Sequence, residues 1–337
     1  MTSIERVQAA VNFEAPDRAP VIAQVFGHTA VIAGKTLGDY ARSGKEVADC
    51  QLKALERYGY DAVFAIMDVN IETEALGSKL VYRRDNYPYV ELPAFSKNTN
   101  LDSIPIPNPA KSARMPEILD ALDIMRREVG NEVLIVGGIL GPMTLATQLL
   151  GMETALYLAI DEPESFEKLL DYCVRVAVEF GVAQVRAGAH VPLVFDPSAS
   201  QAVIPPQFFR EFELPRLKQV FAALKSAGAA AGWLHVAGPI SSIVPSCVES
   251  GADIFNFDYC VEPGLVIDQA PSICVNGNIK SLDFEEAPPE EVLAESLRLL
   301  ELFARRGGYI LSSGCEIPPG SRPENVHAMV SATRKRR

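Results

Sequence analysis

The sequence has few cysteines for its length and no long hydrophobic run. Only six of the 337 residues are cysteines, and their irregular spacing excludes a fold held together by a disulfide framework. No apolar stretch approaches the ~20 residues of a membrane-spanning helix. Residues 1–12 lack the apolar core of a signal peptide and predict a short amphipathic helix instead. We therefore expect a cytoplasmic protein without a membrane partner.

Positive charge is also scarce. The chain carries 31 lysines and arginines against 43 aspartates and glutamates, which leaves a net charge of -12. This balance disfavours nucleic acids and anionic membrane surfaces as partners, because both carry negative charge themselves. Hydrophobic residues make up 48% of the chain, which is enough to form a large core.

The chain alternates between short apolar runs and segments in which apolar residues recur at helical spacing. Near-continuous apolar runs are typical of parallel strands that are buried on both faces. Prolines tend to fall at the starts of the helical segments and glycines at their ends, as helix termini favour. The apolar runs are residues 20–26, 61–67, 132–139, 190–195, 229–235, 253–257, 272–277 and 308–313, and the clearest helical segments are residues 43–59, 161–188, 205–228 and 288–307.

A closed (β/α)8, or TIM, barrel consists of eight strands that alternate with helices, and the sequence has eight such runs. The sequence therefore predicts an α/β fold with a single barrel domain over residues 1–337 and a short helical extension at the N-terminus. The alternative is an open, doubly wound sheet, but the G-x-G-x-x-G turn that usually marks it is absent from the sequence. Residues 80–92 interrupt the alternation and predict a β-hairpin around Asp85 and Asn86, near the barrel rim.

Polar residues follow the apolar runs where a barrel places its active site. The loops after the C-terminal ends of the strands form the catalytic face of such a fold. His235 ends the fifth run, and Cys260 and Cys315 follow the sixth and the eighth. One imidazole and two thiolates that converge on one face suit Zn²⁺, with a fourth position left for water or substrate. The other polar residues near these strand ends include His28, Asp68, Asn70, Asp196, Asp258, Asn278 and Glu316.

The remaining cysteines and histidines are interpreted as structural. The cysteines lie inside helical or strand patterns, where a thiol usually packs as a small hydrophobic group. Asp68 and Asp196, in contrast, follow strands, and we expect them to act in catalysis rather than in packing. The residues predicted to be structural are Cys50, Cys173, Cys247, Cys274, His190 and His327.

Several motifs follow one another along the chain over residues 4–333. They are APDRAPV, ETEALGSKL, GPMTLATQLLG, DPSAS, PPQFFREFELPRLKQV, LHVAG, VNGNI and SSGCEIPPGSRPENVHAMV. In this order and combination they resemble the uroporphyrinogen decarboxylase superfamily. The resemblance implies the same (β/α)8 barrel that the alternation of runs predicts.

Two branches of that superfamily differ in the loop after the first strand. In true uroporphyrinogen decarboxylases, this loop carries an arginine pair that binds the carboxylates of the tetrapyrrole. The matching segment here, AQVFGHTAV (residues 23–31), has no arginine, although Asp68 matches an aspartate of the decarboxylases. Guanidinium groups are the natural partners of carboxylates, so this segment disfavours a porphyrin site.

The second branch contains cobalamin-dependent methyltransferases. These enzymes hold zinc through a histidine and a cysteine after the fifth strand and a second cysteine after the eighth. His235 and Cys315 match the first and last of these ligands, but Ala237 stands where the middle cysteine is expected. The resemblance therefore implies that another group completes the site: Cys260 is the predicted ligand, and Glu316 and then Asp258 are the alternatives.

The resemblance implies a zinc-dependent methyltransferase that moves a methyl group between a small molecule and the cobalt of a separate corrinoid protein. The corrinoid-binding motif D-x-H-x-x-G is absent, so cobalamin must come from this partner. The altered ligand set favours the demethylating component for a methyl ether or methylamine, with a thiol as the alternative. The predicted acids are Asp68 and Asp196, and the predicted substrate-binding residues are His28, Asn70, Trp233 and Asn278.

Two functions of other kinds stay open. Uroporphyrinogen decarboxylation is the first, because the superfamily includes it. A barrel that binds a ligand without catalysis is the second. Metal content separates the predicted methyltransferase from the non-catalytic barrel, because zinc bound through Cys315 supports the enzyme.

Overall fold

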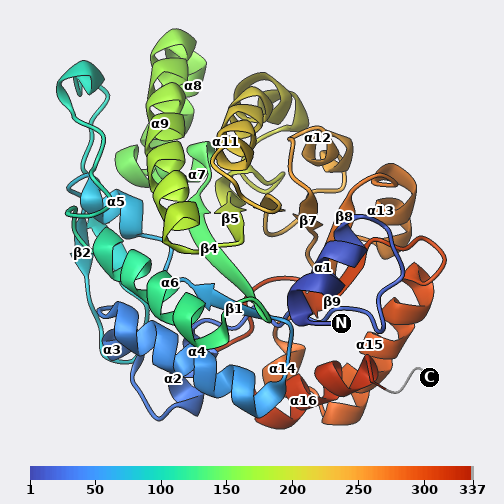
Figure 1. Ribbon diagram of the computed structural model, residues 1–337. Coiled ribbons are helices and arrows are strands. Elements are labelled where there is room, and N and C mark those ends of the chain that lie inside the picture. The colour runs from blue at the N-terminus through green and yellow to red at the C-terminus, as the bar shows by residue number, and fades with distance from the viewer. Residues whose placement is uncertain (335–337) are drawn as a thin grey trace.

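The computed structural model describes residues 1–334, so the last three residues of the predicted domain lie outside the described residues. Its core is a curled sheet of seven parallel strands in the order β1-β4-β5-β6-β7-β8-β9 (Figure 1). Each strand pairs with the next strand of this sheet along the chain, which confirms the predicted α/β fold with parallel strands. The strands are β1 (Ala62–Ala65), β4 (Leu134–Leu140), β5 (Val191–Phe195), β6 (Trp233–His235), β7 (Ile254–Asn256), β8 (Cys274–Ile279) and β9 (Tyr309–Ser313).

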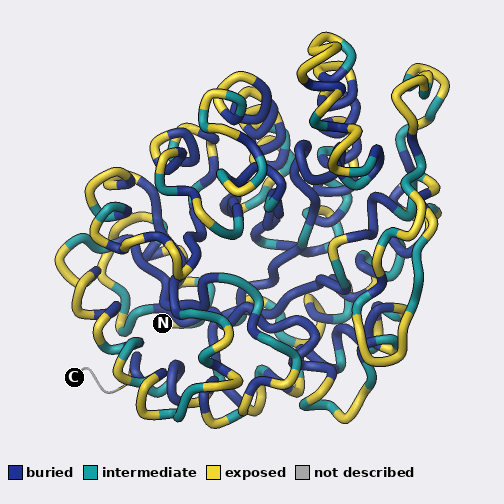
Figure 2. The backbone as a smooth tube through the Cα atoms, turned by 180° about the vertical axis from the view of Figure 1, so that it is seen from behind, coloured by how far each residue is buried: buried dark blue, intermediate teal, exposed yellow. Residues whose placement is uncertain are grey.

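Helices cover the outside of this sheet (Figure 1). Figure 2 shows the consequence: the buried backbone lies inside, and the exposed backbone lies at the periphery. The larger helices are α1 (Ser3–Val11), α4 (Gly44–Tyr58), α6 (Met115–Val129), α7 (Pro142–Leu150), α8 (Met152–Asp161), α9 (Pro163–Ala187), α11 (Leu214–Ser226), α15 (Pro289–Phe303) and α16 (Pro323–Ala332). The shorter ones are α2 (Gly27–Ile32), α3 (Leu37–Tyr40), α5 (Ile71–Ala75), α10 (Pro206–Phe208), α12 (Val244–Val248), α13 (Pro263–Gln269) and α14 (Asp283–Glu286).

The first predicted strand, residues 20–26, is not a strand of the sheet. It forms a single parallel bridge between Val21 and Leu311 of β9. On its other side, the Asp61 N–H donates to the Val21 carbonyl, so the segment lies between β9 and the start of β1. The strand pairing of this segment ends after the bridge because the chain turns there: the Val25 N–H donates to the Ala23 carbonyl. The seven-stranded sheet is established, and the closed eight-stranded barrel stays a prediction.

The carboxylate of Asp61 ties the N-terminal helix to this junction. Its Oδ1 accepts hydrogen bonds from Arg6 and Arg18, and its Oδ2 accepts from Arg18 and from the Val21 N–H. Asp61 is completely buried, and a buried carboxylate is stable only when it is paired and hydrogen-bonded in this way. The predicted N-terminal helix, α1, is therefore anchored to the sheet rather than separate from it.

Two irregular elements lie next to the functional site. The predicted hairpin is present as β2 (Lys79–Val81) and β3 (Tyr89–Leu92), which pair antiparallel. The predicted helix over residues 205–228 is broken into α10, a π-helical turn (Phe209–Glu213) and α11. Pro215 explains the break, because proline lacks the N–H of a continuous helix and its ring clashes with the preceding turn.

In the described part of the chain, no single helix is both long and apolar enough to cross a bilayer. The pair α7 and α8 meets these criteria only when its two helices are taken together, and they are bent by 108° at their junction. Helix α7 itself packs inside the protein, since eight of its nine residues are buried.

Candidate functional site

A cavity of about 210 Å³ lies at the C-terminal ends of the strands. It contains the two residues that match the zinc ligands of the methyltransferases, His235 at the end of β6 and Cys315 just after β9. Its walls are mostly apolar. The residues that line it are Phe26, Ile66, Asp68, Val69, Asn70, Tyr87, Pro88, Phe195, Pro197, His235, Ala237, Cys315 and Glu316.

His235 and Cys315 face each other although 80 residues separate them in the chain. The Cys315 Sγ lies 3.7 Å from the His235 Nε2. Burial lowers the pKa of His235 to about 4 and raises the pKa of Cys315 to about 12. Near neutral pH the imidazole is therefore neutral and the thiol protonated, until a cation or another charge partner favours the thiolate.

The distance between these two atoms fits a shared metal ion. Zinc–nitrogen and zinc–sulfur bonds at a tetrahedral angle place the two donor atoms about 3.6 Å apart. The His235 Nδ1 makes no hydrogen bond within the described residues. The charge of Asp258 and the side chain of Asn256 raise the pKa of the imidazole against the larger, lowering effect of burial. The separation of His235 and Cys315 is therefore compatible with two ligands of one zinc ion.

The predicted third ligand does not join this pair. Cys260 is exposed and is not among the residues that line the cavity. Ala237 lines the cavity instead, at the position where the related methyltransferases carry a cysteine. Among residues 1–334, no group of three or more histidine, cysteine, aspartate or glutamate side chains is arranged to hold a metal ion. The loop after β7 directs the Cys260 side chain outward, which its position in the sequence did not reveal.

Of the two alternative metal ligands, Asp258 already accepts a hydrogen bond with each of its carboxylate oxygens. Its Oδ2 accepts from the Gly238 N–H and its Oδ1 from the Tyr259 N–H. Glu316 is the other alternative, and it lines the cavity. Its Oε1 accepts from the Tyr87 hydroxyl at 2.6 Å and from the Gly27 N–H at 3.1 Å, and burial raises the pKa of Glu316 to about 7. Glu316 can therefore hold or release a proton near neutral pH.

Asp68 also lines the cavity, but its carboxylate forms an ion pair with an arginine that does not line the cavity. Arg114 donates to both carboxylate oxygens of Asp68, and its Nε donates to Glu74. The Asn70 N–H donates to the Asp68 Oδ1, and the Asn70 side chain donates to the Pro88 carbonyl. Both oxygens of Asp68 thus accept hydrogen bonds from these neighbours, which fix the position of its carboxyl group.

Asp196, the second predicted acid, does not line the cavity. It is completely buried, and its Oδ1 accepts from the backbone N–H and the hydroxyl of Thr144. Its other side faces the buried carboxyl group of Glu213 from the π-helical turn, and the two groups affect each other's pKa. Phe195 and Pro197 on either side of Asp196 do line the cavity. Asp196 is therefore placed to hold the cavity wall, not to touch a bound molecule.

Three of the predicted substrate-binding residues are packed away from the cavity. His28 bonds to the Tyr58 hydroxyl and the Pro319 carbonyl, and burial lowers the pKa of His28 to about 4. Trp233 is fully buried inside the sheet. Asn278 donates to the carbonyls of Asp258 and Val261. Of the four predicted substrate contacts, only Asn70 lines the cavity.

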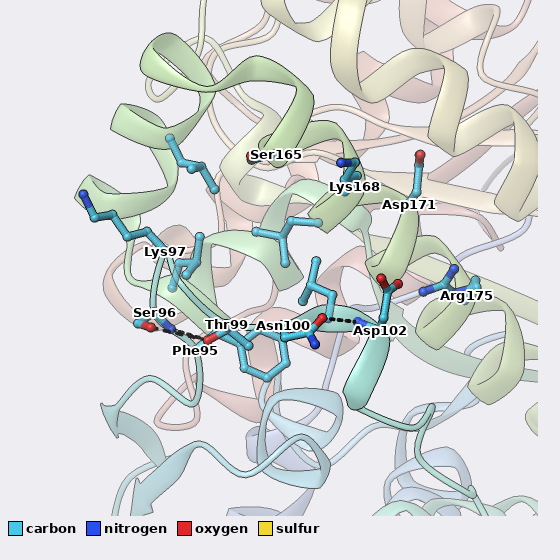
Figure 3. A pocket seen from close by; sticks show the side chains of 14 residues that line it. Phe95, Ser96, Lys97, Thr99, Asn100, Asp102, Ser165, Lys168, Asp171 and Arg175 are labelled. Atoms are coloured by element: carbon cyan, nitrogen blue, oxygen red, sulfur yellow. Dashed lines mark hydrogen bonds between the residues drawn. The ribbon is translucent and has the colours of Figure 1, made fainter.

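A larger cavity of about 380 Å³ lies outside the sheet, between residues 95–102 and α9 (Figure 3). Apolar side chains and charged side chains of both signs line it, and the charged ones include Lys97, Lys168, Asp171 and Arg175. No cysteine or histidine lines it. The smaller central cavity is therefore the candidate site, because of these two cavities it alone is lined by a histidine and a cysteine.

Sequence reasoning missed two residues that shape the central cavity. Tyr87 comes from the hairpin connection and bonds to Glu316, which is 229 residues away. Arg114 precedes α6, in a stretch that reads as a loop, and reaches Asp68 across 46 residues. The hairpin pattern placed Tyr87 near the rim, but no local signal marks the partner of either residue.

Known proteins resemble this chain over most of its length. A methylcobamide:CoM methyltransferase (MtaA) from Methanosarcina barkeri is 29% identical over 285 residues, which cover 82% of this chain and 80% of that protein. A uroporphyrinogen decarboxylase from Geobacter metallireducens is 26% identical over 315 residues, or 91% of this chain and 90% of that protein. The solved structure of a methyltransferase from Methanosarcina mazei matches with a TM-score of 0.91 and 25% identity over 99% of both chains.

The family assignment rests on nearly the whole chain. The sequence matches the uroporphyrinogen decarboxylase (URO-D) family over residues 2–336. The relatives include enzymes of both branches that the motifs suggested, and the methyltransferase branch supplies the matching structure. The chain belongs to the uroporphyrinogen decarboxylase family, as its motifs predicted.

Proposed function

We propose that this protein is a methyltransferase that exchanges a methyl group between a small substrate and the cobalt of a separate corrinoid protein. The observation that carries the proposal is the contact between His235 and Cys315 at 3.7 Å in a largely apolar cavity. The similarity to the methylcobamide:CoM methyltransferase supports it, since that match covers 82% of this chain. We further propose that the protein is the demethylating component and that it works in the cytoplasm.

The cavity offers distinct roles to its residues. His235 and Cys315 would hold a zinc ion, which when bound would supply Lewis-acid activation of the substrate heteroatom. Phe26 and Phe195 pack edge to face with ring centroids 6.0 Å apart, and this wall excludes water from the reacting group. Glu316, with its pKa raised to about 7 by burial, is the proposed proton donor or acceptor in place of Asp68 and Asp196.

The experiment that tests the proposal measures methyl transfer to cob(I)alamin. The donors are a panel of methoxyarenes, methylamines and methylated thiols, and zinc is quantified on the same samples. We expect Cys315→Ala to lose both transfer and zinc, because it removes one of the two clustered donors. Cys260→Ala is the matched control and should keep both, since Cys260 is exposed outside the cavity.

Two results would contradict the proposal. If no donor on the panel transfers its methyl group with either free or protein-bound corrinoid, the activity is wrong. If Cys260→Ala loses zinc while Cys315→Ala retains it, the assignment of the metal-binding residues is wrong.

Uroporphyrinogen decarboxylation is the second candidate, because decarboxylases are among the relatives and the chain belongs to their family. A tetrapyrrole needs cations to bind its carboxylates. Neither lysine nor arginine lines the cavity among the described residues. Formation of coproporphyrinogen from uroporphyrinogen would establish this activity and overturn the methyltransferase proposal.

A further inference from the structure

Three neighbouring strands place polar side chains next to one another beside the central cavity. His235 of β6 is in register with Asn256 of β7, and Asn256 is in register with Asn276 of β8. Side chains that are in register on adjacent strands point to the same face of a sheet, so these three lie side by side. Asn256 and Asn276 are completely buried, and His235 is 2% exposed. Bulk solvent therefore does not complete their hydrogen bonds, and each polar atom needs a partner inside the protein.

The orientation of the Asn256 amide is fixed by Asn276. The Asn256 Nδ2 donates to the backbone carbonyl of Asn276 at 3.0 Å and to its side-chain Oδ1 at 2.8 Å. A backbone carbonyl only accepts hydrogen bonds, so the nitrogen of the Asn256 amide must lie on this side. The Oδ1 of Asn256 therefore points away from the carbonyl of Asn276 and is an acceptor only.

Two buried atoms of this group lack a partner. Neither the Asn256 Oδ1 nor the His235 Nδ1 has a hydrogen-bond partner within residues 1–334. The first is an acceptor, and the second is a donor when it carries the ring proton. The side chain of Asn256 raises the pKa of His235, which is the effect of an acceptor on an imidazole rather than of a donor. The two atoms are therefore chemically complementary.

The other ring nitrogen of His235 faces the second ligand of the candidate zinc site. The His235 Nε2 lies 3.7 Å from the Cys315 Sγ. A neutral imidazole has one protonated nitrogen and one with a free lone pair, and a metal ion binds the nitrogen with the lone pair. With the proton on Nδ1, the lone pair of Nε2 is directed toward Cys315. With the proton on Nε2, His235 does not offer a ligand on that side.

We propose that Asn256 is a positioning residue of the site: its Oδ1 accepts a hydrogen bond from the His235 Nδ1 and so keeps Nε2 free for a metal ion. This inference rests on the proposed function, since it adds a residue to the same site. Histidines that bind metals donate their second ring N–H to such a partner, which fixes both the tautomer and the orientation of the ring.

Asp258 is the alternative acceptor, because its charge also acts on His235. Its two carboxylate oxygens already accept hydrogen bonds from the Gly238 and Tyr259 N–H groups. The Oδ1 of Asn256 has no such partner, and its strand is in register with His235. These differences favour Asn256.

Nitrogen-15 NMR of the metal-free wild-type chain tests which ring nitrogen carries the proton. The chain has four histidines, and the signals of His235 are identified by their loss in His235→Gln. We expect the proton of His235 on Nδ1 near neutral pH. A proton on Nε2 in the wild type would overturn the inference, whatever the variants of Asn256 do.

A pair of variants then assigns the tautomer to Asn256. Asn256→Leu removes the acceptor and keeps a similar volume, so it should move the proton toward Nε2 and weaken zinc binding by about 10–100-fold. Asn325→Leu is the matched control, because Asn325 of α16 is also completely buried, has an unpartnered Oδ1 and does not line the cavity. It should change neither the tautomer nor the affinity for zinc. Retention of the Nδ1 proton in a folded Asn256→Leu protein would show that Asn256 does not hold His235.

The tautomer is measured without metal, corrinoid or methyl donor, so its outcome is separate from catalysis. If Asn256→Leu moves the proton but the wild type transfers no methyl group to cob(I)alamin, the proposed function fails and the role of Asn256 stands. If the wild type binds zinc and transfers methyl groups while Asn256→Leu leaves the tautomer and the zinc affinity unchanged, the function stands and the inference fails.

Discussion

Asp196 and Glu213 form a buried pair of carboxyl groups beside the cavity wall. Asp196 Oδ2 and both oxygens of Glu213 have no ordinary hydrogen-bond donor among the described residues. Burial is the main cause that raises the pKa of each group, and the proximity of Asp196 raises that of Glu213 further, against a smaller lowering effect of Arg216. Two carboxyl groups in such contact share one proton rather than ionise together.

This shared proton predicts how stability depends on pH. Above the pKa of an ordinary carboxyl group, the folded pair keeps a proton that the carboxyls of the unfolded chain have lost, because burial raises the pKa of both groups. The folded state then binds more protons, so its stability falls as pH rises through the range in which the pair stays protonated, by up to about 1.4 kcal/mol per pH unit. Glu213→Gln should flatten the dependence, as measured by urea unfolding at each pH.

A comparison of variants separates this pair from other titrating groups. Burial also raises the pKa of Glu72 and Glu316, to about 7, but both groups are present in every variant and contribute equally to each slope. Glu211→Gln is the matched control, because Glu211 belongs to the same turn but is exposed. If wild type, Glu211→Gln and Glu213→Gln all show the same slope, the pair does not share a proton.

At the scale of elements, α9 and α11 pack closely through a glycine. A Cβ placed on Gly181 of α9 would lie 2.5 Å from the Leu224 Cδ2 of α11 and 3.2 Å from the Ile139 Cδ1 of β4. Leu224 is fully buried, so it has little room to move. The glycine thus sets how closely the helix layer approaches the strand that leads to the cavity wall.

We predict that Gly181→Ala lowers the free energy of unfolding by about 1–3 kcal/mol, because overpacking outweighs the gain in helix propensity. Gly264→Ala in α13 is the matched control, since no atom lies within 4 Å of its added Cβ. It should leave stability unchanged or raise it by up to about 1 kcal/mol. Urea unfolding measures both, and equal stabilisation by the two variants would refute the packing argument.

At the scale of the whole molecule, the N-terminal helix, the sheet and the outer helices are expected to unfold as one domain. Trp233 is the only tryptophan and is fully buried at the centre of the sheet, packed against Phe64 of β1 with ring centroids 6.3 Å apart. Asp61 lies at the other end of β1 and holds two arginines of the N-terminal segment. Trp233 and Asp61 therefore lie in two distant parts of one core.

Trp233 fluorescence and far-UV circular dichroism should show the same unfolding midpoint, as a single cooperative unit requires. Asp61→Ala leaves two arginines without their buried partner and should cost roughly 3–5 kcal/mol. We expect it to shift both midpoints together. Separate transitions for the two probes, or a shift in only one of them, would contradict the single domain.

Several features of this fold could be predicted from the sequence because they depend on local interactions. Continuous apolar runs mark seven of the strands, since a strand covered on both faces must be apolar throughout. The run at residues 20–26 misled the prediction, because only its first residues meet the neighbouring strands before Val25 turns away. The helix over residues 205–228 was similarly predicted as continuous across Pro215.

The sequence by itself determined the alternation of strands and helices, the family and the placement of His235 and Cys315 at strand ends. Only the tertiary structure decided that these two meet while Cys260 turns outward, and that Tyr87 and Gly27 hold Glu316 inside the cavity. The physical reason is that strand pattern and strand end follow from nearby residues. The direction of a loop side chain instead depends on packing between segments that are far apart in the chain.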